Sequence, residues 1–137
     1  MVAQSITRDQ LFLSQKSHHA TAADLNIASN LRDTLISHDN QAAGLAANMI
    51  GQNKQIIAFF AGPLPMVMLN PEIIKKSDPY LATEGCLSLD GQRSTQRYKN
   101  ITVKYQDTNL QEHEQNFSDF TAEVIQHEID HCKGILI

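Results

Sequence analysis

The chain has few of the features that mark membrane, secreted or nucleic-acid-binding proteins. Two cysteines among 137 residues do not suggest a disulfide framework, and the first fifteen residues show no signal-peptide pattern. No apolar run is long enough to span a bilayer. The net charge is −4, and no basic cluster exceeds the pair Lys75 and Lys76. We therefore expect a cytoplasmic protein that has no nucleic-acid or membrane partner.

The length and composition predict one globular domain over residues 1–137. The hydrophobic content of 42% is enough for a core, and no linker, internal repeat or low-complexity tract divides the chain. Turn residues separate several short apolar segments, which predicts an α+β fold with antiparallel β-sheets. The strands are predicted at residues 55–60, 65–69, 71–75, 101–105 and 111–117, with a turn at 107–109.

Two segments show helical periodicity. Residues 21–37 predict an N-terminal helix, in which Thr21 and Asp24 form a capping box. Its apolar stripe, expected to pack in the core, consists of Leu25, Ala28, Leu31 and Leu35. Residues 118–133 predict a second helix, with Ser118 as N-cap and Gly134 just past its end. Its apolar residues, which predict that it is buried against the sheet, are Phe120, Val124, Ile125 and Ile129.

The second helix carries the pattern His127-Glu128-Ile129-Asp130-His131. Histidines four residues apart lie on nearly the same side of a helix, so both imidazoles can face one metal ion. Glu128 is then placed to move a proton of a water molecule. The alternative is a pair of core or surface histidines, but buried histidine and glutamate side chains without partners are costly, which favours a metal.

Catalytic metal sites usually have a third protein ligand. The other candidates are the acidic residues and four histidines, His18, His19, His38 and His113. Of these histidines, His18, His19 and His113 lie in polar segments expected to be exposed. Cys86 is the best candidate, because it lies in Glu-Gly-Cys-Leu-Ser, where the glycine lets the backbone approach closely. A free cysteine is otherwise a small buried apolar residue.

Three motifs in order make the chain resemble the peptide deformylases. These are Gly-Leu-Ala-Ala at residues 44–47, Glu-Gly-Cys-Leu-Ser at 84–88 and Gln-His-Glu-Ile-Asp-His at 126–131, and they span most of the chain. The resemblance implies a hydrolase that removes the formyl group from formyl-methionyl peptides of nascent proteins. It implies one divalent metal ion, natively Fe²⁺ with Zn²⁺ or Ni²⁺ as substitutes, held by Cys86, His127 and His131 on a central helix.

The resemblance also assigns roles around the metal. Glu128 would take the proton of the attacking water and pass it to the leaving amine, and the backbone N–H of Leu87 would stabilise the oxyanion. Ala43 and Gly44 of the first motif would contact the substrate. The glutamine that normally closes that motif is Met49 here, and a thioether cannot donate a hydrogen bond. Asn48 or Gln52 could replace it.

Three further side chains are expected near the substrate. Glu123 takes the place of an apolar residue in the pocket for the methionine side chain, so it disfavours an apolar group there. Arg93 either neutralises Glu123, contacts the substrate or is an exposed loop arginine. Glu84 either orients a metal ligand or pairs with an arginine. Cys132 is expected to be a packing residue.

The chain also lacks the C-terminal helix that follows the metal helix in many bacterial deformylases, so direct ribosome docking through such a helix is not expected. Two alternatives to an active deformylase remain. One is a deformylase-like protein that binds metal or formyl-peptides without useful catalysis, motivated by Met49 and Glu123. The other is a general zinc endopeptidase, which the Cys-His-His ligand set and small size disfavour.

Overall fold

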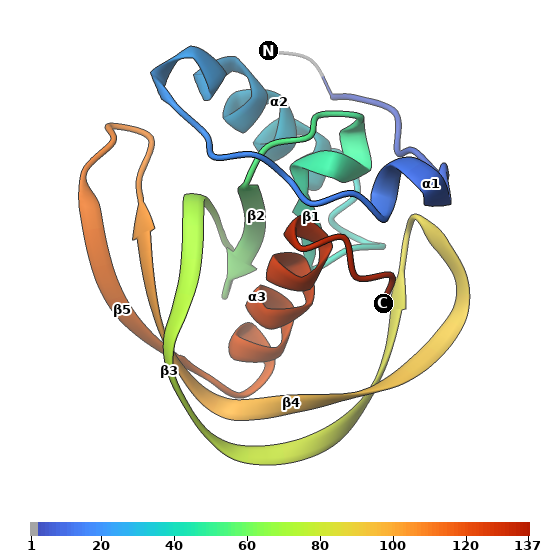
Figure 1. Ribbon diagram of the computed structural model, residues 1–137, viewed down its shortest axis with the longest axis vertical. Coiled ribbons are helices and arrows are strands. Elements are labelled where there is room, and N and C mark those ends of the chain that lie inside the picture. The colour runs from blue at the N-terminus through green and yellow to red at the C-terminus, as the bar shows by residue number, and fades with distance from the viewer. Residues whose placement is uncertain (1–2) are drawn as a thin grey trace.

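A computed structural model describes residues 3–137, in which one antiparallel sheet wraps around a helix (Figure 1). The strands lie in the order in which they occur along the chain. They are β1 (Gly44–Ala46), β2 (Ile56–Ala61), β3 (Leu64–Cys86), β4 (Leu89–Gln106) and β5 (Glu112–Ser118). The helices are α1 (Gln10–Leu13), α2 (Leu25–Ser37) and α3 (Asp119–Cys132), with 3₁₀ turns η1 (Ala22–Asp24) and η2 (Ala47–Ile50). The predicted α+β class is confirmed.

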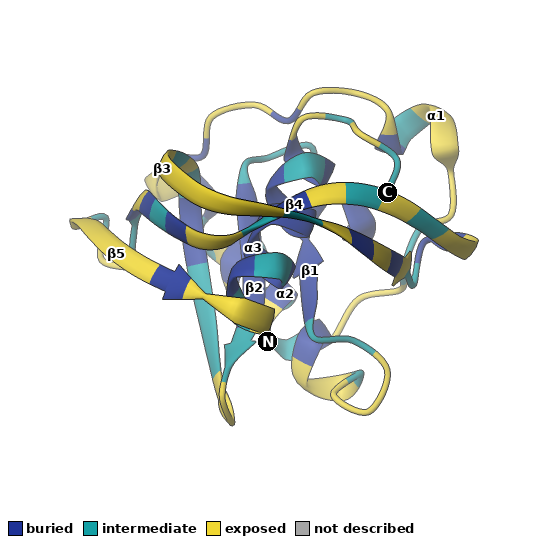
Figure 2. Cartoon of the chain, turned by 90° about the horizontal axis from the view of Figure 1, so that it is seen from below, coloured by how far each residue is buried: buried dark blue, intermediate teal, exposed yellow. Residues whose placement is uncertain are grey.

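The paired strands β3 and β4 are much longer than the sequence predicts. They have 23 and 18 residues, and the predicted strands at 65–69 and 71–75 are parts of β3. Register shifts interrupt their pairing after Leu69, Ile73 and Gly85, and such irregularities bend a sheet. Nearly half of the hairpin residues are exposed and few are buried (Figure 2), so its strands lack the apolar alternation from which a strand is recognised.

Helix α3 lies at the centre of the molecule, on the concave side of the sheet (Figures 1 and 2). Ala122 and Ile125 have no exposed surface, and Ile129 is also buried. Phe120 is the exception to the predicted apolar face, since it is 65% exposed in the first helical turn. Ser118 has extended backbone but makes no side-chain cap, whereas Gly134 has φ of 77° and ends the helix as predicted.

Helix α2 covers the other side of the core. Asp24 accepts a hydrogen bond from the Thr21 N–H at 2.8 Å, and the Thr21 hydroxyl accepts one from Ala23, so the predicted capping box is present. It caps η1, which leads directly into α2. Ala28, Leu31 and Leu35 are buried and Leu25 packs against them, so the predicted stripe is confirmed.

α3 is the last helix of the described residues. The helix nearest the C-terminus is therefore the one that carries the predicted metal ligands His127 and His131. Residues 133–137 follow it as a turn and an irregular segment. Among residues 3–137, no helix combines the length and the apolar character needed to cross a membrane.

Candidate metal and catalytic site

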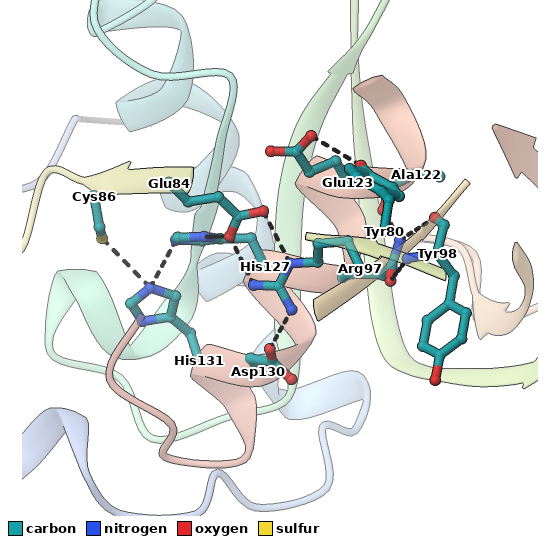
Figure 3. Close-up of polar contacts among 11 residues, drawn as sticks. Tyr80, Glu84, Cys86, Arg97, Tyr98, Ala122, Glu123, His127, Asp130 and His131 are labelled. Atoms are coloured by element: carbon teal, nitrogen blue, oxygen red, sulfur yellow. Dashed lines mark hydrogen bonds and ion pairs between the residues drawn. The ribbon is translucent and has the colours of Figure 1, made fainter. Parts of the chain in front are cut away.

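Three potential metal-donor atoms converge between α3 and the end of β3. His127 and His131 project from successive turns of α3, and Cys86 reaches them from the last residue of β3 (Figure 3). The Nε2 atoms of the two histidines are 3.2 Å apart, and Cys86 Sγ is 3.4 Å from His131 Nε2. All three donor atoms lie within 4.8 Å of one another. The i, i+4 spacing therefore achieves the geometry that the sequence predicts.

The spacing of these atoms fits a tetrahedral ion. Metal–nitrogen bonds of about 2.0–2.1 Å place two nitrogens about 3.3–3.4 Å apart, and a thiolate at about 2.3 Å lies about 3.6 Å from each nitrogen. The observed separations are within a few tenths of an ångström of these values. One thiolate and two imidazoles leave a fourth position free, as in catalytic sites. The residues present thus fit a divalent metal.

A buried ionic chain fixes the ring of His127. Glu84 Oε1 is 2.8 Å from His127 Nδ1, which directs the other ring nitrogen toward Cys86 and His131 (Figure 3). Arg97 donates two hydrogen bonds to Glu84, at 2.7 and 2.9 Å, and a third to Asp130 at 2.5 Å. Glu84 is 6% and Arg97 3% exposed, so this is an ion pair held away from water. Glu84 both orients a histidine and pairs with an arginine, so both roles considered for it are present.

Charge and burial set opposite ionisation states along this chain. Burial alone would raise the pKa of Glu84, but His127 and Arg97 outweigh it and lower the pKa to about 2. Burial opposes the charge on His127 too, yet the Cys86 sulfur and the Glu84 carboxylate raise its pKa to about 10. At His131 burial has the largest effect and, with the neighbouring His127 and Arg97, lowers the pKa to about 3. Near neutral pH His127 therefore carries a proton and His131 does not. A metal ion bound by both rings would displace the proton of His127.

Glu128 is buried beside the donor atoms with one carboxylate oxygen unpartnered. Its Oε1 has no hydrogen-bond partner within the described residues, and burial raises the pKa of Glu128 to about 7. A carboxyl with a pKa near neutrality can both accept and release a proton. Gly44 makes room for it, because a Cβ at this position would lie 3.2 Å from Glu128 Cγ and 2.6 Å from Val124 Cγ1.

A cavity of about 500 Å³ opens over this group. Nine of the eleven site residues predicted from the sequence line it: Ala43, Gly44, Met49, Glu84, Cys86, Leu87, Glu123, His127 and Glu128. His131 lies behind them and is fully buried. Arg93 is not brought to the cavity, because its guanidinium turns to the Asp90 carbonyl at 3.0 Å. The proposal that Arg93 neutralises Glu123 therefore has no contact to support it.

Met49 lines the cavity as a hydrogen-bond acceptor. Its Sδ accepts from the Ala46 N–H at 3.4 Å, and the side chain is buried. Neither proposed replacement for a donating glutamine lines the cavity: Asn48 donates to the His131 carbonyl at 2.8 Å, and Gln52 is exposed. The side-chain donor that the first motif usually supplies has thus no counterpart from these two residues.

Glu123 presents a carboxyl to the cavity wall. The Tyr80 hydroxyl donates to Glu123 Oε1 at 3.0 Å, and burial, together with this contact, raises the pKa of Tyr80 to about 12. Burial and the nearby Glu84 raise the pKa of Glu123 as well. The expected polar group in the wall is therefore present, with a tyrosine as its partner.

Three members of this network were not predicted from the sequence: Arg97, Asp130 and Tyr80. Arg97 lies 13 residues after Glu84 and reaches it only because the pairing of β3 with β4 extends from Leu69 to Cys86 of β3. Asp130 sits between the two helix histidines, and its value as a partner for Arg97 depends on that same pairing. These contacts could have been predicted only from the register of β3 and β4, because no local sequence pattern indicates them.

The remaining histidines and Cys132 lie apart from the donor group. His18, His19 and His113 are exposed as predicted, and His113 pairs with Asp107 at 2.6 Å. His38 bonds the Thr34 carbonyl. Cys132 is buried in the core, which raises the pKa of its thiol to about 12, in keeping with the packing role expected of it.

Comparison with known proteins gives one consistent result. The family model described as polypeptide deformylase matches residues 4–137. A peptide deformylase of Clostridium beijerinckii is 49% identical over 132 residues, which cover 96% of this chain and 97% of the relative. The crystal structure of Thermotoga maritima peptide deformylase has a TM-score of 0.87 at 28% identity, covering 99% of this chain and 95% of that chain.

A further solved structure carries a bound peptide. It is a class I type b peptide deformylase from Acinetobacter baumannii bound to Met-Ala-Ser, with a TM-score of 0.86 at 28% identity. The alignment covers 99% of this chain and 97% of that chain. With a family model over nearly its whole length and a close relative of the same length, the chain belongs to the peptide deformylases, a family of metal-dependent hydrolases.

Proposed function

We propose that this protein hydrolyses the N-terminal formyl group of formyl-methionyl peptides of nascent proteins with one divalent metal held by Cys86, His127 and His131. The observation that carries the proposal is the convergence of these donors, with their spacing for a tetrahedral ion, beside the unpartnered carboxylate oxygen of Glu128. A thiolate with two imidazoles suits Fe²⁺, Zn²⁺ or Ni²⁺, and we take Fe²⁺ as the native ion by analogy with the family.

A divalent ion in this site supplies Lewis-acid polarisation of the formyl oxygen and makes water acidic enough to react near neutral pH. The protein's part begins with Glu128. Its carboxylate accepts a proton from the attacking water, and it then donates that proton to the departing amine as the formyl C–N bond breaks. A pKa raised by burial to about 7 lets one side chain do both.

Oxyanion stabilisation rests on the backbone. Leu87 lines the cavity next to Cys86, and its N–H is the donor that we assign to the developing negative charge on the formyl oxygen. Met49 accepts a hydrogen bond and cannot add a second donor. Transition-state stabilisation in this protein therefore depends on Leu87 more heavily than in relatives that keep the glutamine.

A sheet edge beside the cavity can bind the substrate peptide. β1 is an edge strand of the sheet, and Ala43 and Gly44 at its start line the cavity. An extended peptide can add to such an edge through main-chain hydrogen bonds while its first side chain enters the pocket. Glu123, bonded to Tyr80, makes one wall of that pocket polar. We therefore place the first side chain of the substrate against Glu123.

The proposal is tested by formate release from a panel of formylated peptides with protein loaded anaerobically with Fe²⁺. We expect release from formyl-methionyl peptides and its loss in Glu128→Ala. Glu112→Ala is the matched control, because Glu112 is an exposed strand glutamate whose ion-pair partner within the described residues is Lys104 at 3.8 Å. Fully metal-loaded protein that releases no formate would overturn the proposal.

Met49 favours one second candidate, a deformylase-like protein that binds metal or formyl-peptides without useful turnover. The distinguishing change is Met49→Gln, which restores a side-chain donor at the cavity wall. Activity that appears only in Met49→Gln supports the binding protein. Substantial activity before the change supports the enzyme.

A further inference from the structure

A segment outside all three motifs connects the two parts of the chain that border the oxyanion position. This segment, the N-terminal strap, comprises residues 6–9. The Thr7 N–H donates to the Met49 carbonyl at 2.7 Å. Arg8 donates through Nη1 to the Leu87 carbonyl at 3.1 Å and through Nη2 to Asp90 Oδ1 at 2.5 Å. Figure 1 shows α1, which follows the strap, beside the β3–β4 turn.

The strap is held on both sides. Its first residue, Ile6, packs against the core. Its last residue, Asp9, caps α1 by accepting hydrogen bonds from Leu11 and Phe12, and Leu13 of α1 has no exposed surface. Because its ends are fixed, the strap can hold the guanidinium of Arg8 at a defined place over the β3–β4 turn.

That turn contains the peptide group between Leu87 and Ser88, which is bonded at both of its ends. Its carbonyl oxygen accepts the hydrogen bond from Arg8, and its N–H, that of Ser88, donates to Cys86 Sγ at 3.4 Å. The strand register is irregular just before it, between Gly85 and Cys86, so strand pairing does not fix the turn. The orientation of this one peptide group couples a metal-donor sulfur to the residue that carries the oxyanion donor.

We infer that Arg8 is a positioning residue: it holds the Leu87–Ser88 peptide group so that Cys86 keeps its N–H partner and the Leu87 N–H keeps its aim into the cavity. The inference rests on the proposed function of Leu87. It has particular weight in this chain, because Met49 cannot supply a second donor if the Leu87 N–H turns away.

The solvent exposure of the Arg8–Asp90 ion pair distinguishes a positioning role for Arg8 from a role in stabilising the fold. The Arg8 side chain is 54% exposed and that of Asp90 97%, and ion pairs this open to solvent add little to stability. Removal of the Arg8 side chain should therefore change turnover while leaving the fold and metal content intact. A misdirected catalytic group loses rate even when every residue of the site is present.

The test compares Arg8→Ala, Arg8→Lys and Arg32→Ala in zinc-loaded protein. Arg32 is the matched control: an arginine with a 50% exposed side chain on α2, whose acidic partner among residues 3–137 is its neighbour Asp33 at 3.9 Å. For Arg8→Ala we expect kcat to fall about tenfold, with KM, metal content and Tm as in the parent protein. Arg8→Lys should recover part of the loss, because one ammonium can still reach the Leu87 carbonyl.

A second readout does not require activity. Amide hydrogen exchange of the segment 86–90 should be about tenfold faster in Arg8→Ala than in the parent, with the helix α3 unchanged. If the parent protein releases no formate, the proposed function fails and the exchange data alone decide on Arg8. Equal turnover and equal exchange in Arg8→Ala and Arg32→Ala would overturn the inference, as would a loss of turnover that only follows loss of metal or of Tm.

Discussion

The buried ion pair between Arg97 and Glu84 gives the sharpest prediction. Arg97→Leu removes all three guanidinium hydrogen bonds while keeping an apolar side chain at a buried position. Glu84 then loses its arginine partner and keeps the contact with His127. At pH 7 native Glu84 is ionised, because His127 and Arg97 hold its pKa at about 2, so the variant must bury a carboxylate with His127 as its remaining partner or protonate it.

The structure allows the size of the effect to be estimated. Removing one partner of a buried ion pair costs about 3–5 kcal/mol when the remaining charge is uncompensated, and the contact with His127 places the loss for Arg97→Leu toward the lower end of that range. Asp130, the second partner, is 20% exposed and can be hydrated, so Glu84 dominates the loss. His127 also loses its fixed orientation, and disrupting the partner of a metal-ligating histidine typically weakens metal binding by about 10–100-fold.

Two measurements follow the prediction: urea unfolding of the zinc-loaded protein at pH 7, and zinc affinity by competition with a chelator. Arg32→Leu, an exposed change on α2, is expected to leave both unchanged. Combining Arg97→Leu with Glu84→Gln should recover part of the lost stability, because the unpaired charge is gone. A loss below about 1 kcal/mol in Arg97→Leu, with zinc affinity unchanged, would refute this reasoning.

Two other outcomes follow from the same site. Gly44→Ala places a Cβ 2.6 Å from Val124 and 3.2 Å from Glu128. It should therefore lower kcat/KM for formate release by about tenfold, with little change in zinc content. Activity equal to that of the parent protein would contradict the packing argument. Zinc binding near neutral pH should release a proton from His127, whose pKa is raised to about 10 in the metal-free protein. Affinity should then rise with pH by up to about tenfold per unit, which calorimetry in buffers of different ionisation enthalpy measures; binding without proton release would exclude this. The sign for stability is opposite: the raised pKa stabilises the metal-free protein below about 6.5, and that contribution is lost as the pH rises toward about 10.

Local patterns predicted the parts of the fold that local physics determines. The capping box at Thr21, the stop at Gly134 and the helix between the metal histidines all rest on contacts within one or two turns. The hairpin of β3 and β4 was predicted only in fragments. Its outer residues are polar and exposed, and it is held by backbone pairing along strands that bend around α3, which no apolar alternation reports.

The site shows the same difference between features that local contacts determine and features that depend on long-range strand pairing. His127 and His131 are fixed to one another by helix geometry, so the sequence predicts their spacing. Cys86 was selected from its Glu-Gly-Cys-Leu-Ser surroundings and from the resemblance to a family, but its approach to the histidines depends on the irregular end of β3. Arg93 was a candidate from the sequence and Arg97 was not, although both follow Cys86 on β4. Only the observed pairing turns Arg97 inward to Glu84 and leaves Arg93 on the Asp90 carbonyl.

The long hairpin therefore has a function beyond covering α3. It supplies Cys86, the Glu84 that orients His127, the Arg97 that keeps Glu84 ionised, and the turn that Arg8 holds from outside. α3 contributes the remaining donors and Glu128 from a single rigid element. Any movement of the hairpin relative to α3 must break the contacts of Glu84 with His127 and of Arg97 with Asp130, as well as the spacing of the donors. Because Glu84 and Arg97 also pair with each other across β3 and β4, these contacts link the rigidity of the sheet to the geometry of the metal site.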